Sequence, residues 1–345
     1  MELSFIIEKF ILITVIFLVS LGIAAYSTLA ERKIAGYLQD RVGPNRAGPG
    51  GMFQPLADGL KMFMKEEIIP ADANRFLFIA GPSLALLTAC IGSAVIPWGQ
   101  DMVIGDRIIP LQVTDINVGI LYIFGVVSLG VYGLMIGGWA SNNKFSLMGA
   151  IRAASQNISY EIPMGLSIIA LLLVTNTLSL KEISEMQHGG NWNILYQPLG
   201  FLIFMVCSFA ETNRTPFDLP ECETELVGGY HTEYSGFKMG AFMFAEYLNM
   251  FVASAVMSTL YFGGYNYPGM DYVNGLVGPI IGPLIGMAVL FAKVFAFIFF
   301  FMWVRWTVPR FRYDQLMNLG WKVLIPLAIA NIVITGIWIT IYDKL

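Results

Sequence analysis

Charged residues are scarce in this sequence. Asp, Glu, Lys and Arg together make up 13% of its 345 residues, about half of their share in an ordinary globular protein. Hydrophobic residues make up 56% and gather in long runs. A water-soluble domain would be poorly solvated with so little charge, so the composition predicts an all-α polytopic membrane protein.

Ligands for metals and nucleotides are also scarce. Cys90, Cys207 and Cys222 are the only cysteines, and none has CxxC spacing. The two histidines, His188 and His231, lie far apart. The sequence therefore offers no ligand set for an iron–sulfur cluster, a zinc ion or a bis-histidine haem, and no GxGxxG or GxxxxGKS segment for a nucleotide. If the chain takes part in redox chemistry, the electrons come from another chain.

Long apolar runs recur along the whole chain, and about 20 helical residues are needed to cross a bilayer. The first run has neither the basic start nor the small-residue cleavage site of a signal peptide, so we expect a retained helix. We predict about eight transmembrane helices. They lie near residues 5–29, 74–97, 116–138, 162–178, 194–211, 239–262, 278–304 and 320–342.

Basic residues are concentrated in alternate connections between these spans. The first, third, fifth and seventh connections hold most of the Lys and Arg, whereas the others hold only Arg107 and Lys181. The positive-inside rule therefore places the odd-numbered connections in the cytoplasm or matrix and both termini outside. We call the two sides inner and outer accordingly.

Two inner connections are long enough to be structured parts of a single transmembrane domain over residues 1–345. In residues 31–73, Phe53, Leu56, Leu60 and Phe63 recur at spacings of three and four. This pattern predicts an amphipathic helix that lies in the membrane interface or beneath a partner. The second connection, residues 211–238, is acidic.

Ionisable residues within spans need a reason, because a buried carboxylate costs about 2.5–3.5 kcal/mol on insertion scales. Glu246 lies roughly 10 Å inside its predicted span, and Lys293 places the opposite charge at membrane depth without an identifiable partner. Glu161 either begins a helix, where the helix dipole favours an acid, or lies inside a helix kinked at Pro163. A hydrogen-bonded structural role is the alternative to a functional one for Glu246.

The densest group of acids lies in AETNRTPFDLPECETELVGG, residues 210–229. Asp218 and Glu221 resemble a helix-start capping box. On a helix, Asp218, Glu221 and Glu225 would share one face, where repulsion raises pKa values and allows proton exchange. A solvated acidic loop is the alternative, but interleaved apolar residues predict that the segment is partly covered. Together with Glu161 and Glu246, these acids suggest a proton relay.

Four segments resemble, in order, the inner-side motifs of one family. It is that of the H subunit of bacterial NADH:quinone oxidoreductase, the respiratory complex I subunit equivalent to mitochondrial NADH dehydrogenase subunit 1. The resemblance covers nearly the whole chain. The segments are ERKIAGYLQDRVGPNRAGPGG, FQPLADGLKMFMKEE, AETNRTPFDLPECETELVGGYHTEYSG and WVRWTVPRFRYDQLM.

The resemblance implies a membrane subunit of a proton-pumping translocase that forms the quinone tunnel with the peripheral arm. It also implies that buried carboxylates couple quinone reduction to proton translocation, with no catalytic residue in this chain alone. The residues that it assigns to the tunnel are Glu31, Arg32, Arg41, Asp58, Lys61, Phe63, Arg214, Asp218, Arg305 and Arg310. Those that it assigns to the proton relay are Glu161, Glu211, Glu221, Glu223, Glu225 and Glu246.

The same resemblance implies partners and a location. We expect peripheral-arm iron–sulfur subunits, small and antiporter-like membrane subunits and the lipid bilayer as partners, and no nucleic acid. Ubiquinone or menaquinone would be the substrate, FMN and iron–sulfur clusters would lie in partner subunits, and this chain would bind no metal or other cofactor. The expected location is the bacterial plasma (inner) membrane, and an organellar inner membrane is also compatible.

Two other interpretations of the sequence stay open. The chain could be the anchor of a related membrane-bound hydrogenase, which has similar acidic loops without quinone chemistry. From another class, a secondary transporter would have glycine- or proline-broken helices in paired positions around a midplane site. Pro279 and Pro283 are the only such hint.

Overall fold

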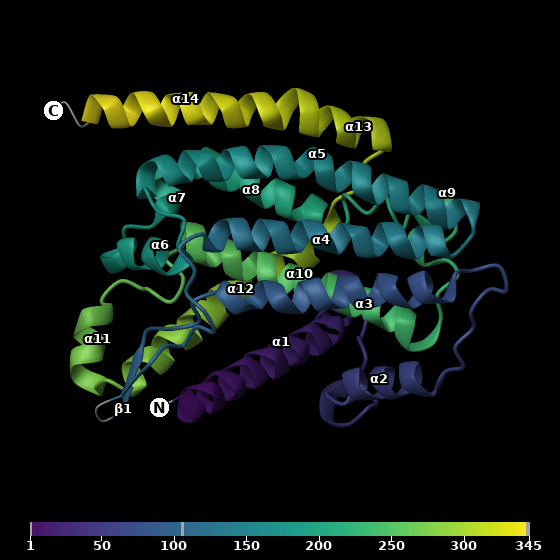
Figure 1. The fold of residues 1–345 in the computed structure, drawn as a ribbon, viewed down its shortest axis with the longest axis horizontal. Coiled ribbons are helices and arrows are strands. Elements are labelled where there is room, and N and C mark those ends of the chain that lie inside the picture. The colour runs from purple at the N-terminus through teal and green to yellow at the C-terminus, as the bar shows by residue number, and fades with distance from the viewer. Residues whose placement is uncertain (1, 105–106, 343–345) are drawn as a thin grey trace.

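The computed structural model describes residues 2–104 and 107–342, and it is an elongated bundle of long helices (Figure 1). The helices are α1 (Glu2–Leu38), α2 (Gln54–Met64), α3 (Arg75–Ile91), α4 (Gly119–Ala140), α5 (Lys144–Thr175), α6 (Leu180–Met186), α7 (Asn193–Tyr196), α8 (Pro198–Glu211), α9 (Glu223–Leu226), α10 (Gly236–Tyr261), α11 (Met270–Val277), α12 (Ile281–Thr307), α13 (Tyr313–Asn318) and α14 (Ile325–Tyr342). The shorter elements are 3-10 turns at Pro49–Gly51, Gly92–Val95, His188–Gly190 and Gly229–His231, a π-helical turn at Leu319–Leu324, and the antiparallel strands β1 (Met102–Ile104) and β2 (Arg107–Ile109). The predicted all-α fold class is confirmed.

Seven helices in the described chain are long and apolar enough to cross a membrane. An eighth span is possible where His188–Tyr196 and Pro198–Glu211 form a pair bent by 76°. Pro198 lies at the first position of α8, where a missing N–H costs nothing and the fixed φ suits a new helix. The span predicted near 194–211 is therefore a broken one.

Two predicted boundaries were wrong because hydropathy marks where a segment is apolar, not where its helix ends. Helix α1 continues past the predicted end at residue 29 to Leu38, so Glu31 and Arg32 are helical rather than part of a loop. Helix α5 begins at Lys144 and contains Pro163 in its interior. Glu161 is therefore inside a helix, the second of the two alternatives.

The short elements divide between the two ends of the bundle (Figure 1). Elements α6, α7, α11 and the β1–β2 hairpin lie at one end, near the labelled N- and C-termini, and α2 and α9 lie at the other. The end with α2 and α9 is the one that carries most of the basic connections. Both termini therefore lie at the end expected to face outward.

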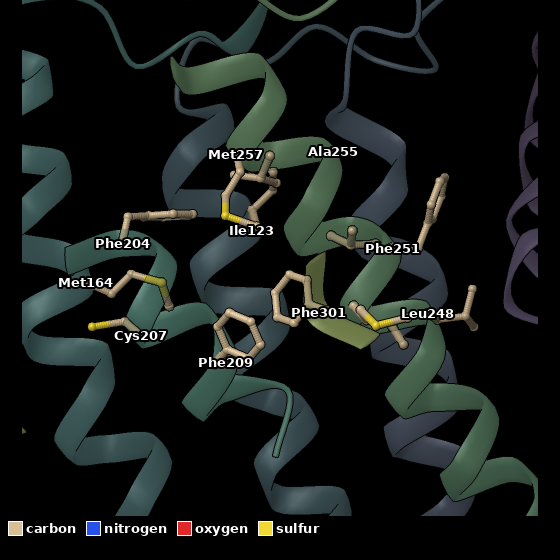
Figure 2. Close-up of a cluster of buried hydrophobic side chains, with 14 of the residues drawn as sticks. Ile123, Met164, Phe204, Cys207, Phe209, Leu248, Phe251, Ala255, Met257 and Phe301 are labelled. Atoms are coloured by element: carbon tan, nitrogen blue, oxygen red, sulfur yellow. The ribbon is translucent and has the colours of Figure 1, made fainter. Parts of the chain in front are cut away.

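The helix α10 runs through the middle of the bundle, and 67% of its apolar stretch is buried inside the structure. Figure 2 shows Met257 of α10 beside Ile123 of α4, with Phe209 of α8 and Phe301 of α12 next to each other below them. Phe209 of α8 packs against Phe301 of α12 with ring centroids 4.1 Å apart. This apolar packing holds α10 in place and thereby fixes the position of Glu246.

Close approach of α3 and α4 depends on small residues. A Cβ added to Gly81 would lie 2.8 Å from the Cα of Gly137, and one added to Gly133 would lie 2.8 Å from the backbone N of Ala85. Membrane helices pack closely when such residues line the contact. Any larger residue at these positions would push α3 away from α4.

Candidate functional site

A buried arginine lies at the centre of the charged residues. Arg214 is 3% exposed. Its Nη1 donates to Glu31 Oε2 over 2.7 Å, and its Nε lies 3.2 Å from Glu246 Oε1. Arg305 Nη1 pairs with the other oxygen of Glu31, also at 2.7 Å. We call Glu31, Arg214, Glu246, Arg305 and the adjoining Tyr247 the Arg214 cluster.

Tyr247 is a member of this cluster that sequence reasoning missed. Its hydroxyl donates to Glu31 Oε2 over 2.9 Å, and the guanidinium of Arg214 lies 4.1 Å from the centre of its ring. Tyr247 thus contributes a cation–π contact through its ring and a hydrogen bond through its hydroxyl. No spacing rule links Tyr247 to Glu31, since the two are 216 residues apart in the sequence.

Electrostatics keep Arg214 charged. Burial alone would lower the pKa of Arg214, but the carboxylates of Glu246 and Glu31 raise it well above its ordinary value. When both are ionised, Glu31 and Glu246 balance the charges of Arg214 and Arg305. Because charges removed from water must be paired to be tolerated, the cluster acts as a unit: neutralising one acid leaves an arginine without a full counter-charge.

The loop that carries Arg214 is fixed by hydrogen bonds to distant helices. The side-chain amide of Gln156, on α5, donates to the carbonyls of Ala210 (2.7 Å) and Phe217 (2.8 Å). The backbone N of Phe311, in the connection after α12, donates to the carbonyl of Pro216 over 3.1 Å. The loop is therefore held by hydrogen bonds to α5 and to the connection after α12.

The predicted helix face of Asp218, Glu221 and Glu225 was wrong. Only Glu223–Leu226 is helical, and Asp218 and Glu221 lie in turns before it. Pro216 and Pro220 lack the N–H that a helix needs and therefore favour turns here. The segment is nevertheless covered in part: its apolar residues Phe217, Leu219, Cys222 and Leu226 are buried, and Val227 is exposed.

Asp218 and Glu221 lie on the inner side of the Arg214 cluster. Asp218 accepts a 2.7 Å hydrogen bond from Arg310, which also donates to the thiol of Cys222. Burial raises the pKa of Asp218 to about 6, although Arg310 opposes the shift. Burial and repulsion by Asp218 also raise the pKa of Glu221, although the hydroxyl of Tyr230 donates to it over 2.9 Å. Both groups can therefore change protonation closer to neutral pH than an ordinary acid.

Further acids lie deeper in the bundle. Glu246 and Glu211 line one cavity of about 40 Å³, and Glu211 also lines a second of about 30 Å³ that reaches Phe204. Glu161 accepts a 2.6 Å hydrogen bond from the hydroxyl of Ser128. A water needs roughly 10–15 Å³ and polar partners, so the first cavity has room for water between Glu246 and Glu211.

Other predicted site residues lie away from this group. Arg32 pairs with Asp58 of α2 at 2.7 Å. The ring of Phe63 is exposed and stacks on Phe237 with centroids 4.6 Å apart. These residues lie together around the end of α1 and along α2.

The remaining predicted residues lie at the inner surface. Arg41 and Lys61 are exposed. Glu225 is 47% exposed in its side chain and pairs with Arg152. The side chain of Glu223 lies outside the described part of the structure.

Lys293 has a different kind of partner from the one considered in the sequence. Its Nζ donates to the carbonyls of Phe262, Gly264 and Asn266 rather than to a carboxylate. Over residues 2–104 and 107–342, no group of three or more His, Cys, Asp or Glu side chains is arranged to hold a metal.

A helical, multi-pass membrane protein with paired acids and arginines buried at one end is the class that this fold and site define. The family model described as NADH dehydrogenase matches residues 10–336. The chain belongs to this family, as the four motifs suggested.

Relatives with similarity over nearly their full length carry one name. The NADH-quinone oxidoreductase H subunit of Flavobacterium johnsoniae is 65% identical over 99% of this chain and 98% of its own length. An H subunit of the same enzyme in Cytophaga hutchinsonii is 66% identical over 98% of both chains. An H subunit in Geobacter metallireducens is 47% identical over 99% of this chain and 98% of its own. These relatives are thus all named as H subunits of an NADH-quinone oxidoreductase.

Proposed function

We propose that this chain walls the quinone tunnel of a proton-pumping NADH:quinone oxidoreductase and passes the effect of quinone reduction to buried carboxylates. The observation that carries the proposal is the series of acids from the inner loop into the bundle. Asp218 and Glu221 face the inner side, Glu246 follows within the Arg214 cluster, and Glu211 follows across a cavity. Tyr230, which donates a hydrogen bond to Glu221, lines the same cavity as Glu246 and Glu211.

The inner end of α1 and α2 suits the entry of a quinone with an apolar tail. Phe53, Leu56, Leu60 and Phe63 of this region are each at least 55% exposed. Asp58 faces the other way, toward Arg32. An exposed apolar face beside charged groups can accept a hydrophobic chain and a polar head together. Arg41 and Lys61 complete this mouth.

Quinone reduction takes up two electrons and two protons, and the electrons come from cofactors of partner subunits. The change in charge near the Asp218–Arg310 pair alters how strongly Asp218 and Glu221 hold protons. Because Arg214 joins Glu31 to Glu246, a rearrangement at the loop reaches Glu246 directly. From there, Glu211 and Glu161 carry the effect toward the side of α4 and α5, where other membrane subunits bind.

The assembly follows from this role. Peripheral-arm iron–sulfur subunits cover the inner loops, and small and antiporter-like subunits continue the series of acids within the membrane. Glu223 and Glu225 lie at the inner entrance to that series. The bacterial plasma membrane is the proposed location.

Glu246→Gln tests the coupling role. The variant should lower the number of protons pumped per electron, because an amide can neither release a proton nor neutralise Arg214. The measurement is proton uptake by inverted membrane vesicles during NADH oxidation. Glu67→Gln, which changes an exposed acid paired with Lys238, is the matched control. Normal stoichiometry and turnover in Glu246→Gln would exclude a relay through this residue.

A photoreactive quinone analogue tests the tunnel. In the assembled complex it should label residues 31–66, and unmodified quinone should compete with the labelling. Labelling elsewhere only, with residues 31–66 unlabelled, would favour the anchor of a hydrogenase-type complex instead.

A further inference from the structure

Lys293 is an isolated charge at membrane depth, with no carboxylate at ion-pair distance in the described chain. It follows the start of α12 at Ile281 by twelve residues, roughly 18 Å along the helix. Its Nζ lies 2.7 Å from the carbonyl oxygens of Phe262 and Asn266 and 2.8 Å from that of Gly264. An ammonium has three N–H donors and a neutral amine has two, so this geometry uses the charged form.

Side chains donate further hydrogen bonds to the turn that binds Lys293 and to the end of α10 before it. The side-chain amide of Gln187 donates to the carbonyls of Thr259 and Leu260 at the end of α10, and the hydroxyl of Ser184 donates to the carbonyl of Gly263. Irregular backbone at membrane depth is tolerated only where protein or water satisfies it. Here side chains supply those hydrogen bonds.

A layer of aromatic rings lies between this turn and the acidic cavities. We define the aromatic layer as Phe201, Phe204, Tyr261, Phe262 and Phe297. Phe204 lines the same cavity as Glu211 and lies 5.8 Å from Tyr261 between ring centroids. Phe201 contacts Tyr261 and Phe262, each at 5.4 Å, and Phe262 contacts Phe297 at 5.3 Å. The Tyr261 hydroxyl is the one polar side-chain atom in the layer, so the layer itself offers a proton no chain of polar groups.

We propose that Lys293 and the aromatic layer form a proton barrier that closes the acidic cavities from the outer side of the membrane. A proton moves through a protein along waters and polar groups, and the layer interrupts such a path. Beyond it, the fixed positive charge of Lys293 repels an arriving proton, and its three N–H groups offer no acceptor. Charged side chains exclude protons and cations from membrane pores in the same way.

The barrier matters because the acids must exchange protons with one side at a time. If the cavities were open to the outer side, protons would flow back through this chain whenever a gradient existed. The barrier acts in the resting protein, without quinone turnover. Failure of the barrier therefore appears as a proton leak without turnover. Failure of the proposed coupling role appears only as a changed number of protons pumped per electron.

Lys293→Gln and Lys293→Arg form a matched pair for the test. Both side chains can donate hydrogen bonds to the carbonyls, but only Arg keeps the charge. The complete complex, carrying either variant, is reconstituted into liposomes that contain a pH-sensitive dye. A potassium diffusion potential then drives proton leak in the absence of NADH and quinone.

We expect Lys293→Gln to raise the leak severalfold over the wild-type complex and Lys293→Arg to leave it unchanged. Lys181→Met, which removes an outer-side lysine paired with Asp101, should also leave it unchanged. Equal leak in assembled Lys293→Gln and wild-type complexes would overturn the proposal. So would an equal increase in Lys293→Gln and Lys293→Arg, because the charge would then be irrelevant.

A second variant decides the matter if Lys293→Gln does not assemble. Phe201→Ala removes the ring that contacts Tyr261, Phe262 and Phe297 while Lys293 stays in place. The opened layer should admit water and raise the leak. An assembled Phe201→Ala complex that is as tight as wild type would overturn the role of the layer and with it the barrier.

Discussion

Two cations within the helix bundle, the buried Arg214 and the half-buried Lys293, are held in different ways. Arg214 is bound by the carboxylates of Glu31 and Glu246, whereas Lys293 is bound by three backbone carbonyls. A carboxylate can take up a proton and lose its charge, and an amide carbonyl cannot. The surroundings of Arg214 can therefore change with the state of the protein, and those of Lys293 are fixed.

This difference matches the surroundings of the two cations. Cavities and further acids adjoin the Arg214 cluster, while Lys293 binds backbone carbonyls and its Nζ lies 5.2 Å from the centre of the Trp192 ring. We propose on this basis that the inner half of the bundle rearranges charge and the outer half excludes it. Single substitutions can therefore test the charge pairs of the inner half and the surroundings of Lys293 in the outer half separately.

The largest expected effect is that of Arg214→Met. It leaves Glu31 with Arg305 as its remaining arginine partner and removes the ion pair of Glu246. Breaking a buried pair by removing one partner costs about 3–5 kcal/mol, so we expect little assembled complex. Native gel electrophoresis of membranes measures the amount. Arg214→Lys should recover part of it, because a lysine is a point charge that cannot bridge both acids as a guanidinium does. Normal assembly of Arg214→Met would show that the ion pairs of Arg214 with Glu31 and Glu246 are not required to hold the inner half together.

Sequence alone could predict the classes of residue in this site but not their pairing. Composition and hydropathy predicted the helices, and carboxylates in apolar surroundings drew attention to Glu246 and Glu161. The Glu31–Arg214 pair joins residues 183 positions apart. No local sequence pattern can predict a contact over that separation. Only the packing of α1 and α10 around the loop brings them together.

The failures also have physical reasons. Lys293 binds backbone carbonyls, which every residue has, so no search for an acidic partner could find its site. The spacing of Asp218 and Glu221 would also have suited a helix, which was one of the two alternatives for this segment. The prolines of the segment and its anchoring by Gln156 instead produce turns.

The next effect in size is that of Tyr247→Phe. The variant keeps the ring under Arg214 but loses the hydrogen bond to Glu31. A hydrogen bond to a charged group contributes about 1.5–3 kcal/mol, so the Arg214 cluster should loosen without losing its charges. We expect assembled complex with a lower rate of quinone reduction. Tyr247→Leu, which also removes the cation–π contact, should be worse. Equal rates of quinone reduction in the two variants and wild type would show that Tyr247 does not contribute to the function of the Arg214 cluster.

Asp218→Asn changes the pH dependence of the inner half. Burial raises the pKa of Asp218 from 3.8 to about 6, so the wild-type residue is ionised at pH 7 and becomes neutral as the pH falls through about 6. Activity that needs the Asp218–Arg310 pair should fall over that range. The variant is neutral at every pH and should lack this step.

The same shift fixes the sign of the effect on stability. Because the folded state holds the Asp218 proton more tightly than the unfolded state, its contribution is fully present below about pH 4 and is lost as the pH rises to about 6. Thermal inactivation of wild type and Asp218→Asn, compared from pH 4 to 7, measures it. A gap between the two that stayed constant over this range would mean that Asp218 does not titrate there.

The smallest effect should be that of Glu225→Gln. Glu225 pairs with Arg152 at the inner surface, and its side chain is 47% exposed. Exposed ion pairs contribute about 0–1 kcal/mol, so assembly should be unchanged. At the entrance to the acidic series, water and neighbouring acids can replace one carboxylate in proton exchange, which is impossible at the buried Glu246. The number of protons pumped per electron should therefore fall less in Glu225→Gln than in Glu246→Gln. An equal fall would mean that the controlling step lies at the surface of the inner half. Burial would then not determine how strongly an acid affects the number of protons pumped per electron.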